Sequence, residues 1–300
     1  MKKLNLNKKQ KLLVIILVLV VSLASAIIQH FSVPEDSSPE NPSYCKVHYI
    51  DVGQGDCELI ECDGKYLLID AGENGHETQV LNYIHKLGIE KLDYVIATHQ
   101  HSDHIGGLAE VLEEFETETI IMPRLTKEQT PTNSTYRAFL KAVQSSGAQV
   151  IAAKPGNVYS LSQASFEILG PVTDDAEDIN NMSAVAKLTF GENSFIFTGD
   201  AEAEEEREII QNGAVLVCDV LKVGHHGSYT SSCYEWLDAV NPEICVISCG
   251  ENNDYGHPHD VVVDRLYEYT DKIYRTDVCG DIVITSDGKN LNVDYGFEES

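Results

Sequence analysis

The sequence predicts a layered α/β fold, because short β-rich runs alternate with amphipathic helical stretches from Tyr44 almost to the end of the chain. Hydrophobic residues make up 43% of the 300 residues, enough to bury the core of one large α/β domain or of two small ones. The helical stretches are spread among the strands, which argues against a β-sandwich or a helix bundle. No internal repeat or low-complexity segment interrupts the pattern.

Each expected element rests on a periodic run of residues bounded by turn residues. Runs rich in β-branched, aromatic and other apolar residues predict strands at 45–50, 57–61, 66–69, 94–97, 119–122, 149–152, 166–169, 184–190, 194–197, 217–223, 244–248, 281–285 and 291–293. Apolar residues at helical spacing predict helices at 76–86, 107–115, 134–145, 202–212, 232–239 and 259–269.

The N-terminus differs from the rest of the chain. Five lysines precede residues 12–28, an apolar run whose only polar residues are Ser22 and Ser25. This hydrophobic helix is either a signal peptide or an uncleaved membrane anchor, and it leaves the following residues outside the cytoplasm. A stretch rich in Pro, Ser and Glu follows and predicts a tether. We therefore divide the chain into an N-terminal segment at 1–28, a linker at 29–43 and a domain at 44–300.

The charge balance is strongly acidic. The formal net charge is −27, and the five lysines before residue 12 contribute +5, so the exported part carries −32. Such a field repels polyanions, and the chain has no basic nucleic-acid-binding patch. The charge does not forbid nucleic acid at a metal-lined cleft.

The eight cysteines are even in number, as expected for a disulfide-bonded exported protein. Cys218, Cys245 and Cys249 lie in or beside apolar runs, where buried thiols fit as well as disulfides do. No Cys-x-x-Cys pair occurs, which argues against a cysteine zinc site.

Residues 98–107 read T-H-Q-H-S-D-H-I-G-G and follow directly on an apolar run that indicates a buried strand. Imidazoles and carboxylates are ligands that Zn²⁺ and similar ions prefer. His99 and His101 lie two apart in extended backbone, so both side chains point the same way and can bind one metal. Asp103 and His104 follow in the turn and can face a second ion. This segment therefore predicts a metal site at a strand end.

Asp200 ends another apolar run, after Gly199. Burial of a carboxylate is costly unless a cation lies near, so Asp200 is expected to bridge two metals; the alternative is a cap on the helix that follows. Polar clusters end further strands in the same way. They are D-V-G-Q-G-D at 51–56, L-I-D-A-G at 68–72, K-V-G-H-H-G-S at 222–228 and G-H-P-H at 256–259.

Together these motifs, in this order, resemble the metallo-β-lactamase superfamily. They are most similar to the hydrolase domain attached to the ComEC-type DNA-uptake channel and its free-standing exported relatives. The resemblance covers about residues 44–293. It implies a four-layer αββα sandwich, here preceded by the N-terminal hydrophobic helix, with a two-metal cleft at one edge of the sheets.

The resemblance also implies a ligand set. The first metal would be held by His99 and His101, the second by Asp103 and His104, and Asp200 would bridge them. One of the pair at 225–226 would complete the second site. Which of the two binds is open from the sequence; we favour His226 as the ligand, with His225 facing the substrate.

One departure from the family pattern concerns the first metal. Most hydrolases of the superfamily use a third histidine there, but no histidine occurs between His104 and His225. Residues 180–183 read N-N-M-S at the place where that ligand is wanted. An amide oxygen is a poorer ligand than an imidazole, which favours a harder ion. The expected cofactors are two divalent metal ions, Zn²⁺ or Mn²⁺.

The expected function is metal-dependent hydrolysis of a phosphodiester by a two-metal-activated hydroxide, outside the cytoplasmic membrane. Asp103 is expected to orient the hydroxide. Candidate phosphate contacts or proton donors are Lys222, His225, Ser228 and His257. For Lys222, a place in the strand interior is an equal alternative.

Two substrate classes stay open, and one rival function stands beside them. The family resemblance favours DNA, whereas the −32 charge favours a cell-envelope phosphodiester such as a choline-decorated polymer. The rival is a non-catalytic binding or scaffold protein on the same fold, for example a competence accessory protein. The complete set of candidate ligands favours the enzyme. The oligomeric state is not predicted.

Overall fold

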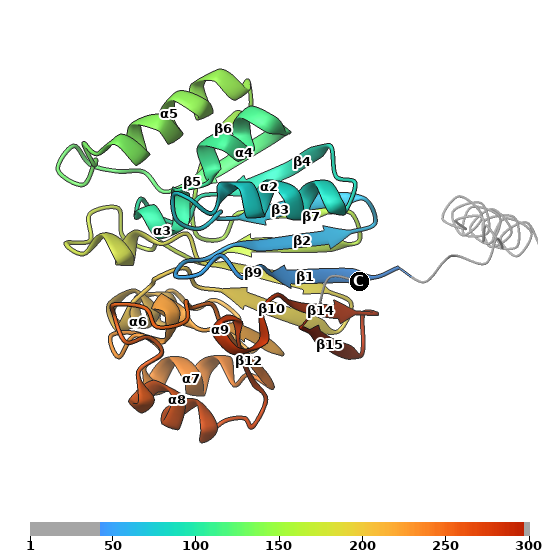
Figure 1. The fold of residues 1–300 in the computed structure, drawn as a ribbon. Coiled ribbons are helices and arrows are strands. Elements are labelled where there is room, and N and C mark those ends of the chain that lie inside the picture. The colour runs from blue at the N-terminus through green and yellow to red at the C-terminus, as the bar shows by residue number, and fades with distance from the viewer. Residues whose placement is uncertain (1–42, 297–300) are drawn as a thin grey trace, which may run out of the picture. The chain divides into compact units, whose positions relative to one another are not determined.

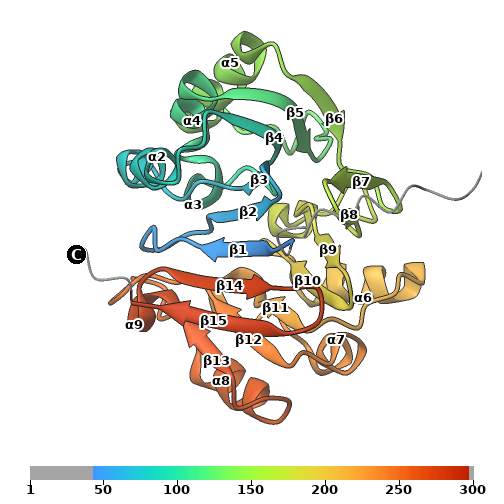
Figure 2. The ribbon, with the colours of Figure 1, turned by 90° about the vertical axis from the view of Figure 1, so that its right-hand side faces the viewer.

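The computed structural model describes residues 43–296, which form two facing β-sheets with helices on both outer faces (Figures 1 and 2). Three apolar clusters separate the four layers. The α/β sandwich with two sheets is therefore confirmed. The N-terminal helix at 1–28 and nearly all of the linker at 29–43 lie outside the described residues.

The first half of the chain builds most of the larger sheet and its covering helices. The strands are β1 (Cys45–Tyr49), β2 (Glu58–Cys62), β3 (Lys65–Ile69), β4 (Lys91–Ile96), β5 (Glu116–Met122) and β6 (Gln149–Ala152). The helices are α2 (Glu77–Lys86), α3 (Ser102–Ile105), α4 (Leu108–Glu114) and α5 (Ser134–Ser146). The side chain of Asn133 caps α5, because it accepts a hydrogen bond from the Tyr136 N–H (2.8 Å).

The second half builds the smaller sheet. Its strands are β7 (Val158–Leu161), β8 (Ala164–Ile168), β9 (Ala186–Phe190), β10 (Asn193–Phe197), β11 (Val220–Lys222), β12 (Ile244–Ile247) and β13 (Ile273–Arg275). The helices are α6 (Ala203–Asn212), α7 (Tyr234–Val240), α8 (Asp260–Tyr267) and α9 (Thr276–Cys279), with 3₁₀ turns η1 (Ile179–Met182) and η2 (Gly224–Gly227). The last strands, β14 (Ile282–Ser286) and β15 (Leu291–Tyr295), return to the larger sheet, where β14 pairs with β1.

The strand order explains where polar side chains gather. The larger sheet runs β15-β14-β1-β2-β3-β4-β5-β6 and the smaller one β13-β12-β11-β10-β9-β8-β7. Strands β3, β4 and β5 are parallel to one another, and so are β10, β11, β12 and β13. Carboxyl ends of parallel strands meet at one edge of a sheet, the usual place for a ligand site in α/β folds. The motifs that follow β3, β4, β10 and β11 are thereby brought to one place.

The core consists of the apolar faces expected from the strand and helix patterns. Between the sheets lie buried aromatic residues such as Phe166 and Phe195. The layer under α2, α4 and α5 contains Leu68 and Phe139, and the layer under α6, α7 and α8 contains Trp236. Each layer buries the apolar stripe of its helices, which is what holds a four-layer fold together.

Most expected elements are present with ends shifted by a few residues. The sequence patterns missed β7, β13, α3 and α9. β7 is an edge strand whose burial alternates weakly, and β13 has three residues that are all half-buried, so neither gives a clear apolar pattern. The expected strand at 217–223 is shorter, because Val217 is largely exposed and only Val220–Lys222 pairs. Within residues 43–296 no helix is long and apolar enough to cross a membrane.

All eight cysteines are free thiols, and all but Cys279 are buried. Cys218, Cys245 and Cys249 lie in the apolar layer under α7 and α8. Cys45 lies directly opposite Cys62 in the β1–β2 pair, the only two cysteines that face each other in the described register.

Glu205 of α6 is a buried acid with half of its carboxylate satisfied. Its Oε1 accepts a hydrogen bond from the Val172 N–H (2.9 Å), whereas Oε2 has no partner. Burial, aided by the neighbouring Glu208 and Glu204, raises the pKa of Glu205 to about 8. Since this pKa lies above that of an unfolded chain, the stabilising contribution of the protonated acid is complete in acid and is lost as the pH rises toward 8.

Glu205→Gln, whose neutral amide resembles the protonated acid, should remove the loss of stability at high pH. A pKa raised from 4.5 to about 8 corresponds to about 5 kcal/mol. We therefore expect the Tm of the variant at pH 9 to exceed that of the unmodified chain by roughly 10 °C. At pH 5 the two should differ little. Scanning calorimetry across this range tests it, with Glu110→Gln, an exposed acid in the first turn of α4, as the control. An equal rise in the control would contradict the assignment to Glu205.

Candidate metal centre

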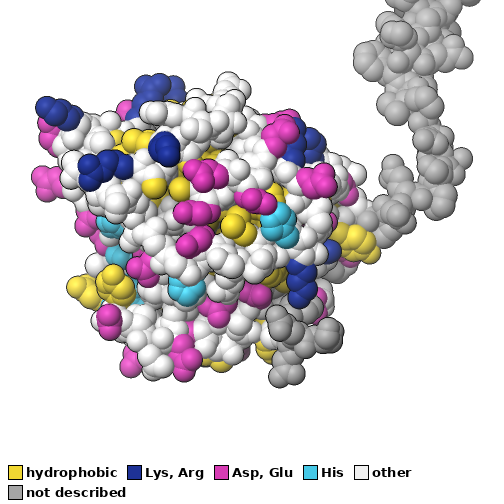
Figure 3. Space-filling view, turned by 45° about the horizontal axis from the view of Figure 1, so that its top comes forward, with side chains coloured by type: hydrophobic (Ala, Val, Ile, Leu, Met, Phe, Trp, Pro, Cys, Tyr) yellow, Lys and Arg dark blue, Asp and Glu magenta, His cyan; other side chains and the backbone are white. Residues whose placement is uncertain are grey.

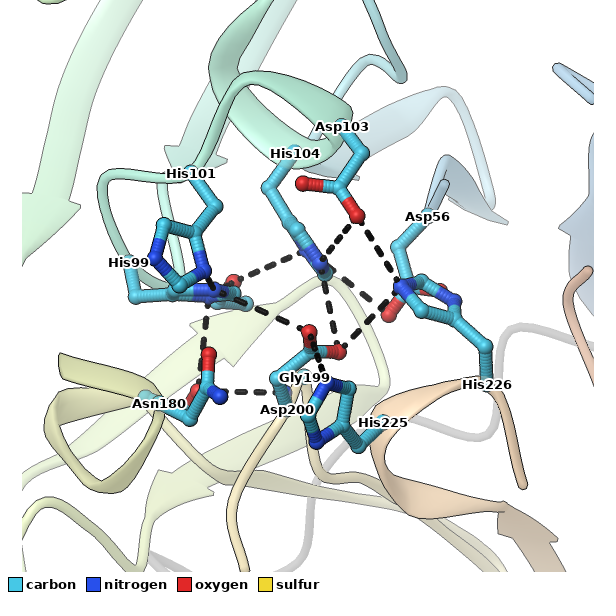
Figure 4. A network of polar contacts seen from close by, with 12 residues as sticks. Asp56, His99, His101, Asp103, His104, Asn180, Gly199, Asp200, His225 and His226 are labelled. Atoms are coloured by element: carbon cyan, nitrogen blue, oxygen red, sulfur yellow. Dashed lines mark hydrogen bonds and ion pairs between the residues drawn. The ribbon is translucent and has the colours of Figure 1, made fainter. Parts of the chain in front are cut away.

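Four residues from both halves of the chain converge beneath an open cleft. The donor atoms of Asp103, His104, Asp200 and His226 lie within 4.8 Å of one another. Asp200 Oδ1 is 3.2 Å from His104 Nε2 and 3.4 Å from His226 Nε2. Asp103 Oδ2 is 3.4 Å from His226 Nε2 (Figure 4). Two imidazoles and two carboxylates in this space form a donor set suited to a divalent ion.

A second group shares one residue with the first. His99, His101 and Asp200 also place their donor atoms within 4.8 Å of one another. His99 Nε2 lies 3.8 Å from Asp200 Oδ2 and 3.0 Å from His101 Nδ1. The two oxygens of Asp200 thus face different groups, as a bridging carboxylate requires.

The free atoms of these residues fit a metal. His104 Nε2, His226 Nε2 and Asp200 Oδ1 are buried and have no hydrogen-bond partner. Burial lowers the pKa of His226, but Asp200 and Asp56 outweigh it and raise that pKa to about 10. Burial lowers the pKa of His99 well below its ordinary value, which leaves its lone pair free. Carboxylates that favour a proton on a neighbouring imidazole also favour a divalent cation there. Such a cation can take the place of the protons on the unpartnered nitrogens.

Polar partners on the far side of the rings fix which nitrogen is free. His104 Nδ1 lies 2.7 Å from Asp70 Oδ2, and Asp70 also accepts hydrogen bonds from the N–H (2.8 Å) and hydroxyl of Thr98. His226 Nδ1 donates to the Ser248 carbonyl (2.9 Å). Nδ1 then carries the proton and Nε2 is left to bind, the arrangement that metal-ligating histidines adopt.

The cleft above these residues has a volume of about 750 Å³. Its floor is formed by His101, Asp103, Asp200 and the pair at 225–226. The walls come from loops after β5, before η1 and after β12. The volume is within the range of small-molecule sites, so the centre is open to a substrate.

Residues 50–251 match the family model described as the metallo-beta-lactamase superfamily. The chain belongs to this superfamily. It is 31% identical over 255 residues to ComE operon protein 3 of Bacillus subtilis and 32% identical over 242 residues to Recombination protein 2 of Haemophilus influenzae. Both alignments cover 79% of this chain but only 32% and 28% of those proteins, so the chain spans about a third of their length.

Among solved structures, the metallo-β-lactamase fold protein YhfI of Bacillus subtilis superposes with a TM-score of 0.53 at 14% identity. The match covers 81% of this chain and 100% of that one. At this identity the likeness concerns the fold. The closer resemblance is the sequence identity to ComE operon protein 3 and Recombination protein 2.

The two histidines at 225–226 lie differently in the candidate site. His226 is buried with its Nε2 among the ligands, while the side chain of His225 is 20% exposed and lines the cleft. His225 Nδ1 lies 3.3 Å from Glu202 Oε1, and its Nε2 is 3.6 Å from Asp200 Oδ2. Both residues have left-handed backbone (φ 49° and 52°), a conformation that costs energy for non-glycine residues and is common at functional sites.

The N-N-M-S segment at 180–183 contacts the candidate ligands through Ser183. Ser183 Oγ accepts a hydrogen bond from the Asp200 N–H (3.0 Å) and lies 3.5 Å from His99 Nδ1. Asn180 is buried, its Oδ1 has no hydrogen-bond partner, and it is drawn with the candidate ligands in Figure 4. The segment therefore has an unpartnered amide oxygen in the same part of the chain.

Lys222 is not at the substrate side of the site. Its side chain is fully buried and its ammonium forms an ion pair with Asp56, whose Oδ1 lies 3.2 Å from His226 Nδ1. The strand-interior alternative therefore describes this lysine. Its side chain reaches Asp56, next to the larger sheet, and does not line the cleft. Ser228 is also buried, and its hydroxyl lies 3.0 Å from that of Thr230. Neither residue lines the cleft.

His257 does line the cleft. Burial, together with the neighbouring imidazoles of His226 and His225, lowers the pKa of His257 to about 4. Its ring is therefore neutral near pH 7, and its buried Nδ1 has no partner. A neutral imidazole can still give or accept one hydrogen bond to a bound group.

Proposed function

We propose that this chain is a metal-dependent phosphodiesterase that acts outside the cytoplasmic membrane. The observation that carries the proposal is Asp200, whose two oxygens face two groups of candidate ligands at the floor of an open cleft. Divalent ions bound there would supply an activated water and neutralise charge on the phosphoryl oxygens. Zn²⁺ and Mn²⁺ both suit this donor set, and the amide of Asn180 favours the harder ion at the first position.

The chain's own side chains have separate tasks in this proposal. Asp103 is partly exposed at the cleft floor and can accept a hydrogen bond from the attacking water. His225 and His257 face the same space and can contact the phosphate or the leaving oxygen. Asp70 and the Ser248 carbonyl hold the ligand imidazoles in position.

The place of action follows from the N-terminal segment, which we propose exports the domain and either anchors it or is removed. The relative named Recombination protein 2 supports DNA as one substrate class. The acidic charge of the domain supports an envelope phosphodiester instead. Both classes share the bond that the proposed centre would break.

Metal removal and return test the proposal directly. Protein purified without chelator should contain close to two equivalents of Zn²⁺ or Mn²⁺ and hydrolyse bis(p-nitrophenyl) phosphate. Dialysis against a chelator should remove the metal and lower the rate by at least about 10²-fold, and each metal added back separately should restore it. Fewer than about 0.5 equivalents, with no activity after reloading, would instead favour a scaffold protein.

A further inference from the structure

The cleft has two chemically different walls. Loops 126–133 and 175–179 form one wall, where the Gln129 side-chain amide donates a hydrogen bond to the Ala176 carbonyl (2.9 Å) and ties the loops together. This wall carries three exposed carboxylates, those of Glu128, Asp175 and Glu177. Gln54, Tyr255 and His257, from the loops after β1 and after β12, also line the cleft.

No lysine or arginine is among the described residues that line the cleft. Lys127 neighbours Glu128 in the chain but is exposed and lies outside the lining. In Figure 3 histidine side chains are visible at the left edge of the molecule, with acidic side chains close by and basic ones above them. Metal ions at the centre would neutralise one phosphate of a polyanion. Its neighbouring phosphates would be repelled by the carboxylates of the cleft.

Tyr255 adds an aromatic face to the same cleft. It is 66% exposed and stacks on His257, with ring centroids 5.6 Å apart and planes at 20°. A Tyr face favours a cation placed over it, and carboxylates across the same space add to that attraction. The pair of walls therefore suits an ammonium group better than an anion.

Gln100 independently indicates a ligand in this cleft. It lies between the metal-motif residues His99 and His101, is only 4% exposed and lines the cleft. Neither its Oε1 nor its Nε2 has a hydrogen-bond partner. An unsatisfied buried amide is costly, so a bound group is expected to satisfy it. A phosphoryl oxygen can accept from Nε2, and Oε1 then faces the positive end of the same molecule.

We propose that the substrate is a small phosphodiester whose organic group carries an ammonium ion, held between the acidic wall and Tyr255. This inference rests on the proposed phosphodiesterase function. Hydrolysis forms a bond from the water oxygen to phosphorus and breaks one P–O ester bond. The departing oxygen takes a proton, and a phosphomonoester remains. The cleft volume of about 750 Å³ suits a molecule of that size.

Two probes that differ only in charge test the inference. p-Nitrophenyl phosphorylcholine carries a trimethylammonium group, and p-nitrophenyl 3,3-dimethylbutyl phosphate has an uncharged tert-butyl group in its place. We expect kcat/KM for the cationic ester to be at least about fivefold higher, and the ratio to fall toward one in high salt.

Variants locate the effect. Glu177→Gln and Tyr255→Ala should each lower the ratio of the two kcat/KM values. Asp174→Asn is the matched control, because Asp174 belongs to the same acidic segment but lines a different hollow, beside Lys154. It should leave the ratio unchanged. A ratio that falls equally in Asp174→Asn would reassign the preference to the overall field of the domain and overturn the subsite.

Binding to chelator-treated protein separates this inference from the proposed function. Calorimetry should show phosphorylcholine binding more tightly than 3,3-dimethylbutyl phosphate, whether or not any diester is hydrolysed. Equal binding of the two would overturn the inference, as would faster hydrolysis of thymidine 5′-(p-nitrophenyl phosphate) than of both choline-shaped probes. If no diester is hydrolysed, the proposed phosphodiesterase function is wrong. The binding comparison then decides alone whether the cleft prefers an ammonium group.

Discussion

Asp200→Ala is expected to lower bis(p-nitrophenyl) phosphate hydrolysis by at least ~10³-fold and to release metal from the protein. Asp200 is shared by both groups of candidate ligands, so its loss takes one donor from each. It also removes the negative charge that most strongly counters the burial of His104 and His226. Metal content by mass spectrometry and kcat/KM measured on the same sample provide the test.

Asp294→Ala is the matched control for this change. Asp294 is an exposed acid on β15, in the larger sheet and away from the cleft lining. It should keep both metal and activity. An Asp200→Ala protein that retained two equivalents of metal and full activity would place the centre elsewhere.

Lys222→Met should destabilise the fold more than any surface change. The substitution leaves the fully buried carboxylate of Asp56 without its main cation. Removing one partner of a buried ion pair typically costs about 3–5 kcal/mol, so we expect the Tm of the chelator-treated protein to fall by about 10 °C. Thermal unfolding followed by circular dichroism measures this.

The double variant Asp56→Asn, Lys222→Met shows whether the uncompensated charge is the cause. It should recover at least half of the lost Tm, because no buried charge is left alone. If the Tm loss of the double variant equals the sum of the losses of the two single variants, the ion pair itself does not stabilise the fold. Lys91→Met is a control for lysine removal at the surface, where Lys91 pairs with Glu116 and Glu118.

The candidate ligands could be predicted from residue spacing and from the family resemblance. The extended backbone after β4 places His99 and His101 on one side, and the carboxyl ends of β4 in the larger sheet and of β10 in the smaller sheet bring Asp200 to them. The αββα layering followed from the alternation of strand and helix patterns in the same way.

Long-range pairing could not be predicted. Lys222 lies in a short strand whose residues are all buried, so alternation says nothing about which side its ammonium takes. Its partner, Asp56, is far away in the chain, and only the packing of one sheet on the other brings them together. The same holds for Gln100, since nothing in its sequence position reveals that its amide is unpartnered.

The pairing of β1 with β14 has a consequence for the order in which the molecule can fold. Strand β1 has two neighbours, β2 and β14, and in the second pair Cys45 lies opposite Ser286. Strand β14 is therefore synthesised long after β1. Such distant contacts slow folding, because a long loop must close before they form. An emerging chain therefore keeps an open sheet edge beside β1 until β14 arrives. A polypeptide that threads through a membrane before it folds would need to be protected from pairing at that edge during transit.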